Sequence, residues 1–351
     1  MVDFISLGRR FALVALAAMA VGGAAGSTPA SAAGPTVREV FEKVAPSVVV
    51  IKAHGRDVTA QGQSGFGETG SGVLVTPDGK VMTAAHVVHA MDQVSVQFLG
   101  GETVTARVAA SEPAADLSLL QLDKVPAGAK VAPMADSNTV HVGDEVVIVG
   151  APYGLAYSLS VGYISARWAP NTVYKTMPLA EFFQTTATIN TGNSGGPMFS
   201  MDGQVIGIVS HNISKGGGSE GLGFVVTMNT AKQLLLEKRS FWSGLEGMLL
   251  NDQLSDLLNL PPRTNGYAVK TVAKGSPGDQ IGLRGATQLV SISGQEVPLG
   301  GDILLSVQGI SAAAANIPKI RDAMAKLNPG DPFKVTILRA GQVLELTGKV
   351  P

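Results

Sequence analysis

Short apolar segments separated by polar turns run through the first two thirds of the chain. Segments of this kind, bounded by Gly, Asp, Pro and Asn, predict β-strands. The predicted strands are Val48–Lys52, Gly72–Val75, Val81–Ala84, Val94–Phe98, Thr103–Ala109, Leu117–Leu122, Glu145–Val149, Ser158–Ser165, Val205–Ser210 and Leu222–Val226. Many short strands at near-regular spacing are typical of a β-barrel or a β-sandwich.

Three segments have helical rather than strand-like patterns. Thr36–Ala45 carries one apolar stripe at helical spacing, and Thr230–Lys238 and Ile317–Leu327 predict two further helices. The pattern of apolar and polar residues changes around residues 239–243, so we place a domain boundary there. The expected organisation is a β-rich domain over residues 34–239 and a smaller α+β domain over residues 240–351.

Residues 1–33 have the pattern of an export signal. Arg9 and Arg10 precede an apolar run of about fifteen residues, and Ala30-Ser31-Ala32 matches a small-residue cleavage site. The run is shorter than the ~20 residues of a membrane-spanning helix, so cleavage is favoured over an uncleaved membrane anchor. The pattern predicts an exported, extracytoplasmic protein, with the choice between general and twin-arginine export left open.

Composition narrows the classes of function. The 351 residues carry a formal net charge of −1, which supplies no positive field to attract nucleic acid. The chain contains no cysteine, so disulfides and thiolate metal sites are excluded. Glycine is abundant, with 43 residues, which agrees with a turn-rich β protein.

The stretch Thr191-Gly192-Asn193-Ser194-Gly195-Gly196-Pro197 carries the strongest chemical signal. A serine between glycines on a tight turn can expose its hydroxyl and leave backbone N–H groups free. These groups, from Gly192 and Ser194, are the expected oxyanion hole. The alternative for this stretch alone is an ordinary surface loop.

A serine nucleophile needs a base, and the chain has only five histidines. His86 lies at the end of an apolar strand, although a lone histidine there is more often structural. Asp116 lies among apolar residues at the start of a strand and needs a buried partner, which an imidazole N–H would supply. His89 follows His86 by three residues, but no third ligand is visible, so we expect no metal site. No cofactor is expected.

The order His86, Asp116, Ser194 within a β-rich domain is the chymotrypsin-type order. Together with Gly70-Ser71-Gly72-Val73 and the segments 83–88, 115–122, 142–155 and 191–197, it resembles the HtrA/Deg family of serine proteases. The resemblance covers nearly the whole chain after the signal. It implies a mainly β fold, with a chymotrypsin-like double β-barrel followed by one α+β PDZ domain. It also implies a homotrimer, with Phe41 and Tyr157 as candidate contacts.

Several residues are candidates for substrate binding. In trypsin-like enzymes the residue six positions before the nucleophile lies at the base of the specificity pocket. That residue is Thr188, which does not favour Lys or Arg; Ile189 and Ile208 nearby favour small to medium aliphatic side chains such as Val or Ala. We expect Val205–Ser210, including Val209 and Ser210, to be an edge strand that binds an extended or unfolded polypeptide.

The second domain begins with a motif similar to the carboxylate-binding loop of PDZ domains. Leu245, Glu246, Gly247 and Met248 are the candidates, and the expected ligand is the C-terminus of a peptide. Residues 286–300 predict an inserted hairpin around Ser293-Gly294.

These patterns favour an exported serine endopeptidase that degrades unfolded or damaged proteins. Two alternatives remain open: a PDZ-based binding or chaperone protein with a latent protease domain, and a regulatory protease with a single signalling substrate. Asn193 is neutral, so activation by an ion pair between it and a new N-terminus is excluded.

Overall fold

A computed structural model describes residues 34–351, apart from residues 156, 215, 217, 239 and 263. Residues 35–351 form one compact unit. The predicted export signal, residues 1–33, lies outside the described residues. Within the described part of the chain, no helix is both long and apolar enough to cross a membrane.

The first helix, α1 (Val37–Val44), follows its sequence pattern closely. The Thr36 side chain accepts a hydrogen bond from the backbone N–H of Glu39, and the Glu39 carboxylate accepts one from Thr36, which is a capping box. Val40 and Val44 bury the apolar face. A short 3-10 turn, η1 (Ala45–Ser47), then leads into the first strand.

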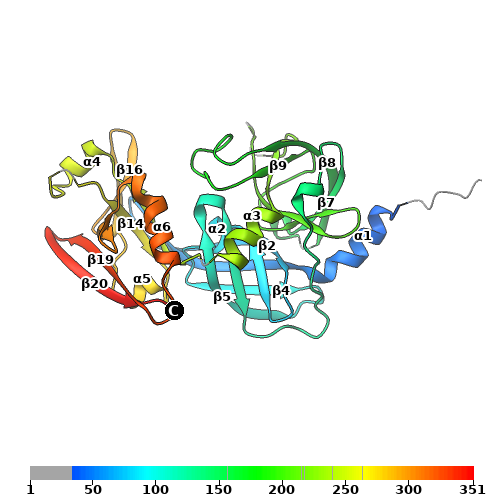
Figure 1. The fold of residues 1–351 in the computed structure, drawn as a ribbon, viewed down its shortest axis with the longest axis horizontal. Helices are drawn as coiled ribbons and strands as arrows, with labels where there is room; N and C mark the ends of the chain where they lie inside the picture. The colour runs from blue at the N-terminus through cyan, green and yellow to red at the C-terminus, as the bar shows by residue number, and fades with distance from the viewer. Residues whose placement is uncertain (1–33, 156, 215, 217, 239, 263) are drawn as a thin grey trace, which may run out of the picture. The chain divides into compact units, whose positions relative to one another are not determined.

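Six strands close the first barrel in the order β1-β2-β3-β6-β5-β4 (Figure 1). Its elements are β1 (Val48–Thr59), β2 (Gly62–Leu74), β3 (Lys80–Thr83), α2 (Ala85–Val88), β4 (Gln93–Phe98), β5 (Thr103–Glu112), η2 (Pro113–Ala115) and β6 (Leu117–Leu122). The predicted strands are present. However, β1 and β2 pair over their whole length, so they extend well beyond the predicted segments into a long polar hairpin.

The second barrel has the order β10-β11-β12-β9-β8-β7. Its elements are η3 (Ser137–Thr139), β7 (Glu145–Gly150), η4 (Pro152–Gly154), β8 (Ser158–Trp168), β9 (Phe182–Thr185), β10 (Pro197–Ser200), β11 (Val205–Asn212), β12 (Gly223–Thr227), α3 (Met228–Lys232) and the π-helical turn η5 (Gln233–Glu237). Two of these strands, β9 and β10, have no counterpart among the sequence predictions. The predicted helix at Thr230–Lys238 is divided between α3 and η5.

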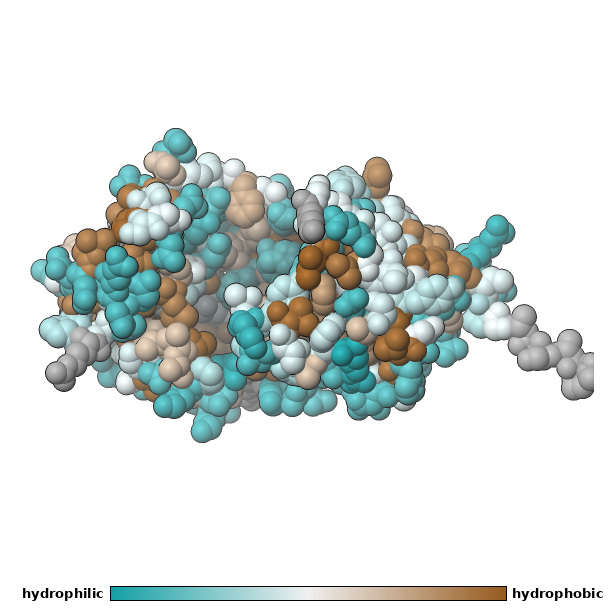
Figure 2. Space-filling view, turned by 90° about the horizontal axis from the view of Figure 1, so that it is seen from above, coloured by the Kyte–Doolittle hydropathy of each residue, from teal (hydrophilic) through white to brown (hydrophobic). Residues whose placement is uncertain are grey.

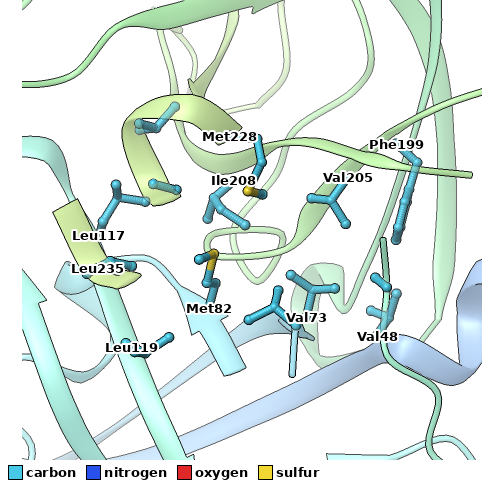
Figure 3. Close-up of a cluster of buried hydrophobic side chains, with 14 of the residues drawn as sticks. Val48, Val73, Met82, Leu117, Leu119, Phe199, Val205, Ile208, Met228 and Leu235 are labelled. Carbon is cyan, nitrogen blue, oxygen red and sulfur yellow. The ribbon is translucent and has the colours of Figure 1, made fainter. Parts of the chain in front are cut away.

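The two barrels share an apolar core. Figure 3 shows side chains from strands of both barrels and from α3 and η5 converging on this core. Val73 and Met82 of the first barrel lie on one side, and Ile208 and Phe199 of the second lie on the other; none of the four is exposed. The loops that carry the candidate site residues are therefore anchored on a packed interior.

The C-terminal part forms a sheet of order β13-β14-β17-β19-β20, with β18 paired to β17. Its elements are β13 (Leu245–Leu249), α4 (Asp252–Leu257), β14 (Tyr267–Val272), α5 (Pro277–Gln280), β15 (Gln288–Ile292), β16 (Gln295–Leu299), β17 (Ile303–Val307), β18 (Ile310–Ser311), η6 (Ala314–Asn316), α6 (Ile317–Ala325), β19 (Pro332–Arg339) and β20 (Gln342–Lys349). The mainly β fold with a double barrel is confirmed, and this sheet with α6 is consistent with the expected PDZ domain.

The strands β15 and β16 pair with each other across Ser293-Gly294. Both turn residues have positive φ angles, 51° and 80°, which is the geometry of a tight two-residue hairpin turn. The structure thus contains a hairpin within the predicted range of residues 286–300.

Apolar side chains also reach the surface. Figure 2 shows separate hydrophobic patches among mostly hydrophilic residues on the face it draws. The exposed large apolar side chains include Tyr153, Leu155 and Tyr163 in and after η4. Phe41 and Tyr157, the candidate trimer contacts, are half-buried and pack against the core shared by the barrels.

Candidate active site

His86 is held by the single helical turn α2, which directly follows β3. The neighbouring residues Ala85, Val87 and Val88 are buried, so the turn is fixed by apolar packing on the side away from solvent. The His86 side chain keeps 46% of its surface exposed and can meet a substrate. Apolar packing of the neighbouring residues therefore fixes the backbone turn that carries the imidazole.

Asp116 ends the short turn η2 in a left-handed conformation, with φ of 54°. Asp tolerates this conformation better than most side chains. The residue is 7% exposed, and its backbone carbonyl accepts a hydrogen bond from Ala85 N–H at 3.1 Å. This hydrogen bond ties the turn carrying Asp116 to the turn carrying His86.

The His86 ring and the Asp116 carboxylate are in direct contact. Nδ1 of His86 lies 2.9 Å from Oδ1 and 3.0 Å from Oδ2 of Asp116, and the backbone N–H of His86 donates to Oδ1 at 3.1 Å. The Ser210 hydroxyl donates to Oδ2 at 2.5 Å. The carboxylate is thus surrounded by donors, which compensates its burial.

These contacts shift both pKa values in the direction that favours the ion pair. Burial opposes a charged imidazole, but the hydrogen bond and negative charge of Asp116, with the charge of Glu68, outweigh it and raise the pKa of His86 above 6.5. Burial likewise opposes the Asp116 carboxylate, but the donors from His86 and Ser210 hold its pKa below 3.8. At neutral pH Asp116 is therefore ionised.

Ser194 lies on the turn between β9 and β10, where two glycines are required. Gly192 has φ of +100° and Gly195 has φ of +80°, both in the left-handed region. A Cβ at Gly192 would collide with the Ala151 carbonyl oxygen, and one at Gly195 would collide with Thr83. The turn can be built this tightly only because these positions lack side chains.

Hydrogen bonds join the serine turn to the first barrel. Ser71 of β2 donates its backbone N–H to the Ser194 carbonyl at 2.8 Å and its hydroxyl to the Gly192 carbonyl at 2.7 Å. The Gly195 N–H donates to the Val209 carbonyl at 2.7 Å. Ser71 therefore fixes the serine turn across the two barrels.

The Ser194 hydroxyl donates to the Ser210 carbonyl oxygen at 3.3 Å. In the part of the chain that the structure describes, no hydrogen bond joins Ser194 to His86. The Ser194 side chain would have to rotate to reach the imidazole. Catalytic hydrogen bonds commonly form or shorten only when substrate is bound.

The predicted substrate edge strand is wrong over most of its length. Residues Val205–Val209 of β11 are paired with β10 on one side or β12 on the other, inside the closed barrel. Beyond Val209, residues 210–212 are not paired with a strand on the β10 side, among the described residues. A free edge is therefore confined to these three residues.

The candidate pocket side chains are largely enclosed. Ile208 and Val209 are not exposed at all and Ile189 is only 2% exposed, because they pack in the apolar cores of the barrels. Thr188 is exposed. Ser210 is 1% exposed, and its hydroxyl faces Asp116.

The candidate carboxylate-binding residues are in a strand, not in a loop. Leu245, Glu246, Gly247 and Met248 form β13, which pairs with β14 and has an irregularity in register between Glu246 and Gly247. This strand lies at the edge of its sheet.

His89, the second histidine of the His86/His89 pair, contacts protein groups through both ring nitrogens. His89 is enclosed between Ser111, at 2.7 Å from Nδ1, and the Leu245 carbonyl, at 3.0 Å from Nε2. Burial lowers the pKa of His89 to about 4, so the ring is neutral at pH 7. The described residues contain no group of three potential metal ligands.

Comparisons with known proteins agree with this geometry. A sequence profile described as a trypsin-like peptidase domain matches residues 70–208. The chain is 35% identical over 246 residues to a probable periplasmic serine endoprotease DegP-like of Hahella chejuensis, covering 67% of this chain and 50% of the relative. It is 29% identical over 336 residues to the periplasmic pH-dependent serine endoprotease DegQ of Escherichia coli, covering 89% and 69%.

The chain belongs to the HtrA/Deg family. A solved structure of the HtrA-type protease AlgW with a decapeptide is 26% identical, with a TM-score of 0.52, and covers 90% of this chain and 98% of that one. This HtrA/Deg-family chain spans about half the length of the DegP-like relative from Hahella chejuensis.

Two residues near the site of this HtrA/Deg-family chain were not recognised from sequence. In the sequence, Ser71 belongs to the motif Gly70-Ser71-Gly72-Val73, but the pattern assigns it no role. The sequence pattern assigns no role to His211, but its ring is stacked on Phe224 with centroids 5.4 Å apart, and its Nδ1 lies 2.8 Å from the Ser210 hydroxyl. The Ser-His pair at the end of an apolar strand was the available signal.

Proposed function

We propose that this protein is an exported serine endopeptidase that hydrolyses peptide bonds in unfolded or damaged proteins of the periplasm. The observation that carries the proposal is the contact between His86 and a buried, ionised Asp116. Ser194 lies on a glycine turn beside them, with its hydroxyl on Ser210, a residue that also contacts Asp116. The predicted export signal and the similarity to periplasmic serine endoproteases support the location.

In the proposed acylation step, Ser194 Oγ attacks the carbonyl carbon of the scissile peptide bond. His86 Nε2 takes the hydroxyl proton, and Asp116 holds the opposite nitrogen, Nδ1, in its protonated form and stabilises the imidazolium. The C–N bond then breaks, and the leaving amine takes the proton back from His86. Water hydrolyses the resulting ester by the same proton transfers in reverse, which frees the acid and restores Ser194.

The negative charge that develops on the carbonyl oxygen needs donors in place before the reaction. The backbone N–H groups of Gly192 and Ser194 are the proposed donors, each contributing about 3–4 kcal/mol in comparable sites. Because Gly192 lacks a side chain, substrate can approach this backbone closely. The site requires no metal or cofactor in this mechanism.

An extended substrate is proposed to pair with the free edge at residues 210–212 of β11. Pairing through the main chain accepts any sequence in an extended conformation, which suits unfolded polypeptides. Thr188 places no negative charge at the expected base of the pocket, so we propose a preference for small aliphatic residues over Lys or Arg at the position before the cleaved bond.

The C-terminal sheet is proposed to be a PDZ domain that binds the C-termini of peptides. A cavity of about 500 Å³ lies beside the edge strand β13, and its apolar lining includes Leu245, Leu304, Ile320 and Met324. A peptide could add to β13 as a further strand while its last side chain enters the cavity. A homotrimer, with Phe41 and Tyr157 among its contacts, is also proposed.

One observation favours the alternative of a latent protease. The Ser194 hydroxyl donates to Ser210 rather than to His86, so the nucleophile is not yet paired with its base. A peptide bound in the C-terminal cavity would then act as an activator of the resting enzyme.

Cleavage of unfolded casein tests the proposed endopeptidase activity. It also separates an enzyme that is active at rest from a latent protease that needs an activating peptide. We expect the purified protein to cleave unfolded casein and to spare a folded protein of similar size. A peptide with an apolar, free C-terminus should increase the rate, and the same peptide amidated at its C-terminus, the matched control, should not. Complete inactivity with and without the peptide would contradict the endopeptidase proposal, whereas activity only with the peptide would favour latency.

We expect activity to fall at acidic pH because His86 must be neutral to accept the Ser194 proton. The pKa of His86 is raised above 6.5, so kcat/KM should increase with pH through a midpoint above 6.5. The pKa of Asp116 is lowered below 3.8, so Asp116 stays ionised throughout this range. A pH profile on a peptide substrate measures the midpoint; a value at or below 6.5 would contradict the prediction. The exposed His54, changed in His54→Gln, serves as a control and should leave the profile unchanged.

A further inference from the structure

His211 is an ionisable side chain next to the candidate triad, and the mechanism does not use it. It follows Ser210 at an irregularity of β11, where the register against β12 shifts between Val209 and His211. Its Nδ1 lies 2.8 Å from the Ser210 hydroxyl oxygen, and that hydroxyl lies 2.5 Å from Asp116 Oδ2. His211, Ser210 and Asp116 therefore form a continuous chain of hydrogen bonds that ends on the triad.

Aromatic rings hold the His211 imidazole in place. The ring is stacked on Phe224 with centroids 5.4 Å apart and an angle of 13° between planes. Tyr174 and Phe182 meet it edge-on, with centroid distances of 4.2 Å and 5.7 Å. Contacts of this kind restrict the ring to one orientation, in which Nδ1 points to Ser210.

The direction of each hydrogen bond follows from the number of protons available. Ionised Asp116 can only accept, so the single hydroxyl proton of Ser210 goes to its carboxylate. The Ser210 oxygen is then an acceptor toward His211, and Nδ1 of His211 must carry the proton. Nε2 is left without a proton; it is buried and has no hydrogen-bond partner among the described residues.

The neutral form of His211 fits this arrangement. Burial lowers the pKa of His211 to about 4; the charge of Asp116 opposes this shift, and the charge of His86 adds to it. The facing groups are thus Asp116, His86 and the Tyr174 ring, whose hydroxyl pKa is raised by burial. In the pH range where His86 changes its charge, His211 stays neutral.

We propose that His211 is a positioning residue that acts on Asp116 through Ser210. By donating Nδ1–H to the Ser210 oxygen, it selects the one hydroxyl rotamer that donates to Asp116. The Asp116 carboxylate is then held in the orientation in which it accepts from His86 Nδ1. This inference rests on the proposed endopeptidase function, and it assigns a role to a residue outside the Ser-His-Asp triad.

Two substitutions separate hydrogen bonding from packing. His211→Phe keeps an aromatic ring of similar size but removes the donor. His211→Asn loses ring packing but can place an amide N–H near the position of Nδ1. If positioning matters, the order of activity and the order of thermal stability should be opposite for these two variants.

We expect His211→Phe to lower kcat about five- to tenfold, the effect of one lost hydrogen bond, with KM changed less than about twofold. His211→Asn should recover kcat to within about threefold of the wild type despite a lower melting temperature. The exposed His141, changed in His141→Phe, is the matched control and should leave kcat unchanged. Wild-type kcat in His211→Phe, or losses of kcat that follow melting temperature in both variants, would overturn the proposal.

A spectroscopic readout separates this inference from the endopeptidase proposal. The His86 Nδ1 proton, held between the ring and Asp116, has a strongly downfield resonance in proton NMR that requires no turnover. We expect this resonance to shift or broaden in His211→Phe and to be restored in His211→Asn. An unchanged resonance in His211→Phe would overturn the positioning role, whereas an inactive wild-type protein would count against the proposed function alone.

Discussion

Replacing Ser194 by alanine is expected to abolish peptide hydrolysis, with kcat lowered by about five to six orders of magnitude. The change removes only the hydroxyl that attacks the scissile carbonyl. Its hydrogen bond to the Ser210 carbonyl, 3.3 Å long, is weak, so the fold should be retained. Hydrolysis of a peptide substrate by purified wild-type and Ser194→Ala proteins measures the effect.

A matched serine-to-alanine change elsewhere controls for the loss of a hydroxyl as such. Ser160 lies on β8 of the second barrel and is not a member of the candidate triad. Ser160→Ala should keep wild-type kcat. If Ser194→Ala retained more than about a hundredth of wild-type kcat while folded, another nucleophile would have to be sought, because water and backbone donors alone do not sustain such a rate.

The second large effect is expected for Asp116→Asn, which should lower kcat about ten-thousandfold with little change in size. An asparagine amide at this place would donate to His86 Nδ1. The imidazole would then carry its proton on Nε2 and could no longer accept one from Ser194. Hydrolysis of a peptide substrate by purified wild-type and Asp116→Asn proteins measures the change in kcat.

Asp123 provides the control for this substitution. It is exposed, it follows β6, and it lies in the same barrel as Asp116. Asp123→Asn should leave kcat unchanged. Activity of Asp116→Asn within about tenfold of the wild type would contradict the assignment of Asp116 as the group that orients His86.

The candidate triad could be predicted from sequence because its signals are local. The glycines around Ser194 are required by the tight turn itself, and His86 and Asp116 each end or begin an apolar strand. The order of the three residues along the chain then indicated a chymotrypsin-like double barrel. The structure brings His86 and Asp116 into contact.

The predictions from sequence that are wrong or missing concern features that depend on which strands pair with each other. Val205–Ser210 is expected to be an edge strand because of its proposed role in binding substrate, but β10, which was not predicted, pairs with it and closes the barrel. Pairing of strands distant in sequence is set by the whole fold and not by local pattern. The position of His211 was missed for the same reason, because its neighbours Tyr174 and Phe182 come from a separate segment before and within β9.

The length of the β1–β2 hairpin was also beyond the sequence signal. Its tip is rich in Gly, Gln and Ser, which have low strand propensity, yet the strands pair continuously from Val48↔Val73 to Thr59↔Gly62. Val58 is buried within this hairpin, but most residues toward its tip are exposed or half-buried, so backbone pairing contributes most of the regular structure there. Sequence patterns find strands by their buried side chains, so they are silent on strands of this kind.

The central claim is that Ser194 is a nucleophile activated by His86 and Asp116. Labelling of the folded protein with a fluorophosphonate probe, which reacts only with an activated serine, tests this claim most directly. We expect the wild-type protein to be labelled on Ser194, and we expect Ser194→Ala to remain unlabelled and Asp116→Asn to be labelled far more slowly. Absence of labelling in the folded wild-type protein, both alone and with an activating C-terminal peptide, would contradict the account.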